Sequence, residues 1–148
     1  MVPLFVLVLS VAILRCAGYL GVNDLDNMDL PLRGGLFLMF LVGASAHWGR
    51  ARADLIRMVP SVFPGADVLV SITGVLEILG AVGLLVPVTA KLAAICLAIL
   101  LVVVFPANLR AAREHLKILG RPAPGLLVRG AVQVIFLSAL FKVIAQRR

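Results

Sequence analysis

Five long apolar stretches divide the sequence, and the third and fourth are separated only by Pro87 and Val88. Each stretch approaches the roughly 20 apolar residues that a helix needs to cross about 30 Å of hydrocarbon. The two-residue connection requires the third and fourth stretches to form a tight antiparallel hairpin. The five predicted helices cover residues 2–21, 31–48, 68–86, 89–108 and 124–145.

The composition excludes an ordinary soluble domain. Apolar residues make up 62% of the 148-residue chain and charged residues 14%, whereas a typical soluble domain carries about 25% charged residues. In lipid, backbone polar groups must bond within the protein, which leaves helices or closed barrels. Continuous apolar runs such as residues 93–105 lack the alternation of barrel strands. We therefore predict one domain, residues 1–148, with an all-α fold: a transmembrane helix bundle.

The first stretch is predicted to be a retained helix rather than a signal peptide. No basic residue precedes its apolar run, Arg15 falls late within that run, and no A-x-A site leads into a polar chain. A bundle of four helices, with the first segment interfacial or cleaved, is the alternative.

The net charge of +7 is interpreted as loop charge facing anionic lipid, not as a nucleic-acid surface. The loops at 49–67 and 109–123 contain Arg50, Arg52, Arg57, Arg110, Arg113, Lys117 and Arg121. The opposite side has Arg33, Lys91, Lys142, Arg147 and Arg148. This bias favours an orientation with the N-terminus and both long basic loops inside.

Two connecting segments have polar patterns of their own. The loop with Asp24, Asp26 and Asp29 lacks the glycine and distal glutamate of a calcium loop, so we interpret it as a solvated cap that can receive Arg15. Residues 49–67 are predicted to contain a short amphipathic segment at the membrane interface. Pro60 and Pro64 interrupt it and prepare the chain to re-enter the membrane. The apolar face of this segment comprises Leu55, Met58, Val59 and Val62.

Polar residues within the apolar stretches are the candidate functional residues, because such side chains are expensive in hydrocarbon. They are His47, Glu77, Asn108, Arg129 and Gln133. At about 1.5 Å per residue, all five fall in the half of the bilayer next to the basic loops. Arg129 is long enough to reach Glu77, and an Arg–carboxylate pair is the least costly way to keep both charges there. The structural alternatives are an ion pair that sets helix register and polar groups that satisfy helix ends.

Small residues and a proline shape this half of the predicted bundle. Gly74, Gly80 and Gly83 flank Glu77 and allow another helix to approach closely. Pro106 is expected to loosen the fourth helix near its end and to free carbonyls for polar partners. The two cysteines, Cys16 and Cys96, are interpreted as small hydrophobic residues, and no metal site is predicted.

The ordered set His47–Trp48, Pro60, Pro64, Gly74–Glu77, Phe105–Asn108, Arg129 and Gln133 resembles the DoxX-like membrane proteins. The resemblance covers residues 43–137. It implies a four-helix DoxX-like core, with the first helix as one additional N-terminal helix. Some relatives are quinone-linked thiosulfate oxidoreductase subunits, and a distant animal branch acts as an assembly chaperone for receptor channels.

The resemblance and the one-sided polar residues together predict a non-catalytic or quinone-interacting subunit of a membrane redox system. The expected setting is the lipid bilayer of a bacterial inner or plasma membrane, with a membrane redox protein as partner; a homo-oligomer is left open. Quinone is the cofactor that this resemblance suggests. The alternative is a scaffold or assembly protein that docks a larger partner through its glycine-lined third helix. A solute transporter fits less well, because the chain has no inverted repeat.

Overall fold

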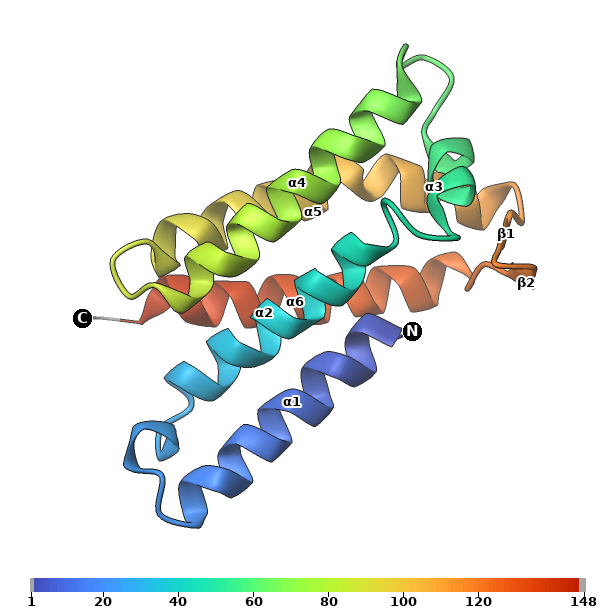
Figure 1. Cartoon of the computed structure of the whole chain (residues 1–148). Helices are drawn as coiled ribbons and strands as arrows, with labels where there is room; N and C mark the ends of the chain where they lie inside the picture. The colour runs from blue at the N-terminus through green and yellow to red at the C-terminus, as the bar shows by residue number, and fades with distance from the viewer. Residues whose placement is uncertain (1, 147–148) are drawn as a thin grey trace.

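The structure is a computed structural model that describes residues 2–146. It contains six α-helices within that range, one short 3-10 helix and a two-stranded hairpin (Figure 1). In chain order the elements are α1 (Val2–Tyr19), the 3-10 helix η1 (Asn23–Leu25), α2 (Asp29–Ser45), α3 (Arg52–Met58), α4 (Ala66–Leu85), α5 (Ala90–Arg113), β1 (Lys117–Ile118), β2 (Arg121–Pro122) and α6 (Leu126–Ala145).

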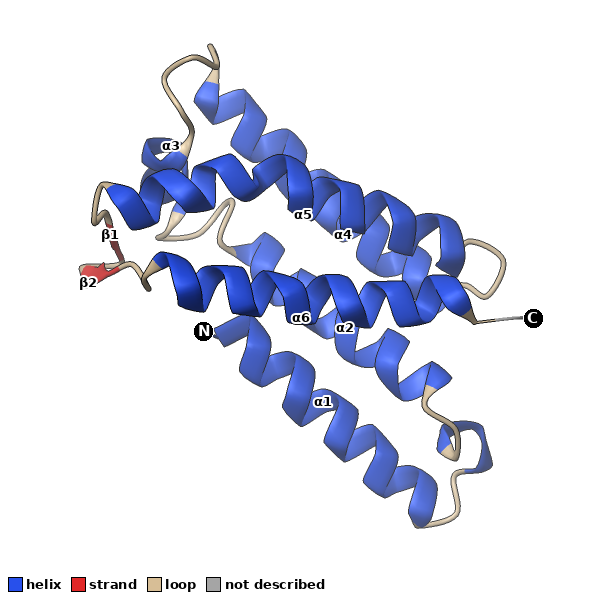
Figure 2. Ribbon diagram, turned by 180° about the vertical axis from the view of Figure 1, so that it is seen from behind, coloured by secondary structure: helices blue, strands red, loops and turns tan. Residues whose placement is uncertain are grey.

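Helices α2, α4, α5 and α6 form a four-helix core, and α1 lies outside it against α2 (Figures 1 and 2). Within the core, α2 packs on α4, α4 on α5 and α5 on α6, while a smaller contact between α6 and α2 closes the ring. The predicted all-α bundle with four core helices and one additional N-terminal helix is therefore confirmed.

Four of the described helices, α1, α4, α5 and α6, are long and apolar enough to cross a membrane. Only 11–22% of the residues in their apolar windows are buried inside the protein. The remaining apolar surface needs a nonaqueous environment, so the chain is a membrane protein. Helix α2 is shorter, with 17 residues, and at about 1.5 Å per residue it extends roughly 25 Å.

The core is built from aliphatic side chains with a few alanines that let the helices approach. Its most deeply buried members come from all four core helices: Leu36, Met39 and Phe40 of α2, Ala81 and Leu84 of α4, Ala94 and Leu97 of α5, and Leu140 of α6. Leu7 of α1 joins the same cluster. Helix α1 is thus attached to the bundle through one face, and its other faces remain apolar and exposed.

Glycines set the close helix contacts. A Cβ on Gly35 would lie 2.5 Å from Val11 Cγ2 of α1, and a Cβ on Gly80 would lie 2.5 Å from Leu97 Cδ2 of α5. A Cβ on Gly74 would lie 2.7 Å from His47 Cβ. The close approach predicted at the α4 glycines is confirmed, and the neighbours that occupy these positions belong to the same chain.

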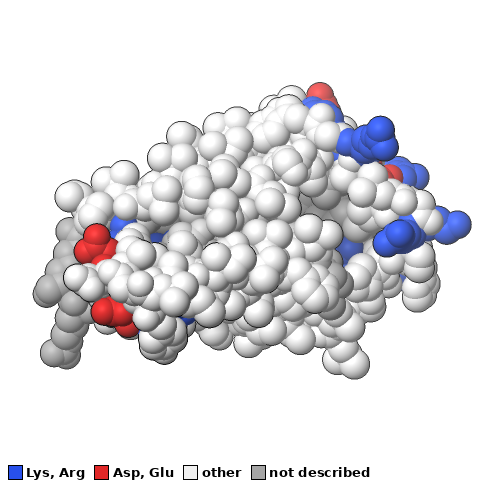
Figure 3. Space-filling view, turned by 60° about the horizontal axis from the view of Figure 1, so that its bottom comes forward, with Lys and Arg blue, Asp and Glu red and all other residues white. Residues whose placement is uncertain are grey.

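Charge is unevenly distributed between the two ends of the bundle (Figure 3). The loops around α3 and the β1–β2 hairpin lie at one end together with the start of α1 (Figure 2); we call this the basic end. Its cations are Arg50, Arg52, Arg57, Arg110, Arg113, Lys117 and Arg121. The α1–α2 connection and the α4–α5 turn lie at the other end, the distal end, which contains Asp24, Asp26 and Asp29.

Several local predictions need adjustment. Helix α5 continues past Asn108 to Arg113 instead of ending at Asn108, so Pro106 is accommodated inside it. The amphipathic segment contains the short helix α3, in which Met58 is buried, but Val62 is 78% exposed beyond the helix end. Arg15 does reach the aspartate-rich loop, where it donates to the backbone carbonyls of Leu25 and Asp26.

Candidate functional site

The five candidate residues fall into two groups on different helix pairs. His47 and Glu77 lie together between the end of α2 and the middle of α4. Asn108, Arg129 and Gln133 lie together between α5 and α6, where all three line one cavity. The sequence predicted that all five residues lie in the same half of the bilayer. In the structure they form two separate polar sites.

Arg129 and Asn108 connect α6 to α5. The Arg129 guanidinium donates from Nη1 to Oδ1 of Asn108 at 2.6 Å and from Nε to the Pro124 carbonyl at 3.2 Å. The Pro124 carbonyl belongs to the segment just before α6, so Arg129 folds back toward the basic end. Both partners are half-buried, and a charge-assisted bond of this kind is among the stronger polar contacts in proteins.

Gln133 lies one turn further along α6 and bonds to the backbone of α5. Its Nε2 donates to the Leu101 carbonyl at 2.8 Å. Pro106 has no N–H and therefore interrupts the hydrogen-bond ladder of α5 close to this carbonyl. The carbonyl that Pro106 leaves without a helical N–H partner is that of Val102, so the Gln133 contact lies beside the freed carbonyl and not on it.

These three side chains line a cavity of about 740 Å³ between α5, α6, the β1–β2 hairpin and the start of α1. Arg121 of β2 adds a second cation, and Val2–Leu4 of α1 form one wall. The other walls are mainly apolar and include Leu101, Val128, Val132 and Phe136. A mostly apolar cavity of this size with a few polar groups has the usual form of a small-molecule site.

The predicted Arg129–Glu77 ion pair is wrong. Glu77 pairs with His47, with 3.6 Å between Oε2 and His47 Nε2, while Arg129 bonds to α5 and to Pro124. The reason is the order of the helices: α6 packs on α5, whereas Glu77 projects from α4 toward α2. Equal depth in the bilayer did not place the two charges on facing surfaces.

His47 is oriented by the backbone of α4. Its Nδ1 lies 2.6 Å from the Val70 carbonyl, and the hydroxyl of Thr73 lies 3.4 Å from the same nitrogen. The His47 and Glu77 side chains are only 12% and 14% exposed. Thr73 and Glu77 lie four positions apart on α4, and both side chains face His47.

Sequence reasoning missed Arg52 as a residue that joins the α2 end to α4. Its guanidinium donates to the His47 carbonyl at 2.8 Å, to the Asp67 carbonyl at 3.1 Å and to Ser71 Oγ at 3.0 Å. From the sequence, Arg52 was one of the loop cations of an interfacial segment. The spacing of that segment contained no signal that one of its arginines turns toward the bundle.

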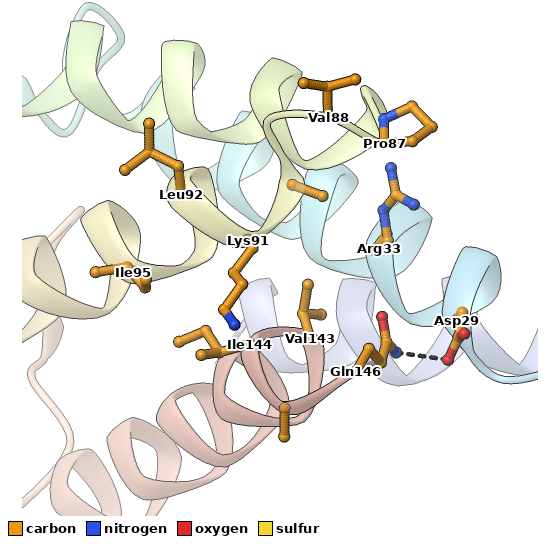
Figure 4. Close-up of a pocket in the computed structure, with 12 residues that line it drawn as sticks. Asp29, Arg33, Pro87, Val88, Lys91, Leu92, Ile95, Val143, Ile144 and Gln146 are labelled. Carbon is orange, nitrogen blue, oxygen red and sulfur yellow. Dashed lines mark hydrogen bonds between the residues drawn. The ribbon is translucent and has the colours of Figure 1, made fainter. Parts of the chain in front are cut away.

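A second cavity, of about 1150 Å³, lies at the distal end between α2, α6 and the α4–α5 turn (Figure 4). Lys91 extends along it toward Ile144, and Asp29 accepts a hydrogen bond from Gln146 at 2.6 Å. Arg33 donates to the carbonyls of Leu84 and Leu85 at the end of α4. The charged groups of Arg33 and Asp29 are therefore used within the fold, which makes this cavity the weaker candidate.

Outside these two cavities, the other candidates for chemistry are side chains that could ligate a metal or carry a reactive thiol. Between residues 2 and 146, no cluster of three or more histidine, cysteine, aspartate or glutamate side chains could hold a metal ion. Cys16 and Cys96 are both exposed free thiols. The α5–α6 cavity and the His47–Glu77 pair therefore remain as the places where the described residues offer chemistry.

Comparison with known proteins gives a family without an assigned activity. No curated protein and no solved structure matches the chain. Residues 36–144 match the family described as Domain of unknown function (DUF8561). The matched range begins within α2 and ends within α6, so it covers both polar sites and leaves α1 outside. The chain belongs to the DUF8561 family.

Proposed function

We propose that this chain is a DoxX-like protein of a bacterial plasma membrane that binds a quinone in the α5–α6 cavity and serves a membrane redox system as a non-catalytic subunit. The observation that carries the proposal is the placement of Arg129, Asn108 and Gln133 at one edge of an otherwise apolar cavity. The sequence resemblance supports the link to quinone and redox partners.

The chemistry of the cavity suits a ring with carbonyl oxygens. Arg129 has five N–H donors, and two of its nitrogens make the bonds described above. Within residues 2–146 the amide nitrogen of Asn108 donates to no protein acceptor, so it is available to a ligand oxygen. The apolar walls, including Leu101 and Phe136, provide surface for a hydrocarbon tail.

The α1 wall of the cavity is itself exposed on the outside of the bundle. Val2–Leu4 form this wall, and Val2 and the neighbouring Phe5 are 63% and 70% exposed. An amphiphile entering beside α1 would keep its tail in lipid while its headgroup reaches Arg129. Residues of this site hold and orient the ring; they include no nucleophile or redox group, which is why we assign a binding role.

The test is binding of a short-chain quinone to protein purified in mild detergent, measured by calorimetry and by native mass spectrometry. Gln133→Leu removes one ligand-facing amide and leaves the Arg129–Asn108 contact in place, so it should weaken binding by about 5- to 30-fold, the equivalent of one lost hydrogen bond of roughly 1–2 kcal/mol. Lys91→Ala, in the distal cavity, is the matched control and should bind as the wild type does.

The possible results separate the alternatives. Loss of quinone binding in Lys91→Ala but not in Gln133→Leu would move the site to the distal cavity. Co-purification of phospholipid alone, with no quinone bound at any concentration, would overturn the quinone assignment. A stoichiometric protein partner without quinone would favour a scaffold; the α4 glycines no longer argue for that role, because His47, Leu97 and Ala93 of this chain already fill the space beside them.

A further inference from the structure

His47 and Glu77 face each other in a way that fixes where hydrogens must lie. The Val70 carbonyl, 2.6 Å from His47 Nδ1, can only accept a hydrogen bond. Nδ1 therefore carries a hydrogen. The other ring nitrogen, Nε2, lies 3.6 Å from Oε2 of Glu77.

In a neutral imidazole with its hydrogen on Nδ1, Nε2 is an acceptor, and both oxygens of an ionised carboxylate are acceptors too. A neutral His47 beside an ionised Glu77 would therefore place two acceptors against each other. One additional proton removes this conflict. It gives either an imidazolium beside a carboxylate or an imidazole beside a carboxylic acid.

Burial of Glu77 Oε2 is a second argument for the additional proton. The Oε2 atom is inaccessible to solvent, and within the described residues it makes no hydrogen bond. A buried ionised oxygen without a partner is strongly unfavourable. Gly43 lies beside this oxygen, at a distance where a Cβ would make an ordinary contact of 3.4 Å, and a glycine supplies no donor side chain.

The surroundings contain few other groups that could neutralise Glu77. From α3, Arg52 directs its guanidinium to the His47 carbonyl, Asp67 carbonyl and Ser71 hydroxyl. From α4, the Thr73 hydroxyl donates to the Leu69 and Val70 carbonyls. From the α2 end, Trp48 packs beside His47 with ring centroids 6.0 Å apart. His47 is thus the group that shares a proton with Glu77.

We propose that His47 and Glu77 form a buried site that holds one shared proton. The transfer within the site breaks the O–H bond at Glu77 Oε2 and forms an N–H bond at His47 Nε2, leaving carboxylate and imidazolium. His47 lies in the turn that follows α2, beside Arg52, so it is the member nearer the basic loops. The proposal is independent of quinone binding, which concerns α5 and α6.

The chain is well suited to a direct test, because it contains two histidines and two glutamates in all: His47 and His115, Glu77 and Glu114. His115 and Glu114 are exposed and adjacent in the α5–β1 loop. Labelling histidine with ¹⁵N and the glutamate carboxyl with ¹³C gives two signals of each kind, one from the site and one from an internal reference. The measurement uses the full-length protein in detergent at pH 7.

We expect His47 to have a protonated Nδ1 and the pair to hold exactly one further proton, on Nε2 or on Oε2, while His115 shows mixed tautomers. At pH 7 the Glu77→Gln variant should hold about one proton fewer than the wild type, counted by potentiometric titration from a common alkaline end point. The same count for Glu114→Gln, the matched exposed glutamate, should equal that of the wild type. An ionised Glu77 beside a neutral His47 would overturn the proposal, as would a pair carrying two further protons. Neither result would bear on quinone binding at Gln133.

Discussion

Arg129 and Asn108 link α6 to α5 through a 2.6 Å hydrogen bond from the guanidinium to the side-chain amide oxygen. The two residues are 21 positions apart and come from helices separated by the β1–β2 hairpin. Because α6 contacts α2 only slightly, the α5–α6 pair depends on such contacts for its register. The same bond holds the guanidinium at the edge of the cavity in which we propose that quinone binds.

Asn108→Ala should lower the free energy of unfolding by about 1.5–3 kcal/mol, because it removes the acceptor of a hydrogen bond to a charged group. Thermal unfolding in a fixed detergent measures the change. Asn108→Asp keeps an acceptor of nearly the same shape, so it should retain most of the stability that Asn108→Ala loses. Equal stability of Asn108→Ala and the wild type would show that the bond contributes little in the folded protein.

The overall architecture could be predicted because it depends on the length of apolar runs. The hairpin at Pro87–Val88 and the approximate helix ranges depend on hydropathy and connection length. The four-plus-one arrangement was implied by the family resemblance instead. The positions at which helices end near polar residues were harder to predict. Asn108 reads as a helix terminus, yet α5 continues to Arg113 because the arginines there can extend into the basic end.

The candidate residues could be identified from the sequence because polar groups are costly in lipid. The residues that they contact could not be identified in this way. Position along a helix gives depth, whereas pairing also depends on which helices are neighbours and on how each is rotated. Glu77 and Arg129 have similar depths and different neighbours. The His47–Glu77 contact depends on a turn after α2, and the role of Arg52 depends on how α3 docks; neither is encoded in a periodic pattern.

Gly80 and Gly130 provide a matched pair for testing close helix packing. Gly80→Ala should destabilise the protein by about 1–3 kcal/mol, because its Cβ would lie 2.5 Å from the buried Leu97 side chain. Gly130→Ala has open space around the new methyl group and should be neutral or stabilising by up to about 1 kcal/mol through helix propensity. Chemical unfolding of both variants in detergent gives the comparison, and equal destabilisation would contradict the packing argument.

Arg52 and Arg50 are two residues apart and should differ sharply. Arg52→Ala removes three hydrogen bonds that join the α2 end to α4, so it should lower the free energy of unfolding by about 1–3 kcal/mol. Arg50 is exposed, and Arg50→Ala should change stability by less than about 0.5 kcal/mol. Amide hydrogen exchange in the first turns of α4 should rise in Arg52→Ala alone; a similar rise in both variants would indicate a general loss of basic charge instead.

Asp54 gives the basic end a predictable response to acid. Its carboxylate accepts the backbone N–H of Leu119 at 2.8 Å and pairs with Arg57, and these contacts lower the pKa of Asp54 below its ordinary value. A lowered pKa in the folded state means that the contact stabilises at pH values above the ordinary aspartate pKa of about 3.9 and is lost as the pH falls through the lower, folded value. Exchange of the Leu119 amide should therefore be constant from neutral pH to about 4.5, after correction for intrinsic rates, and should accelerate in more acidic solution. Asp54→Asn retains an acceptor without the charge and should abolish that acid-dependent step, whereas an unchanged step in this variant would assign it to another carboxylate.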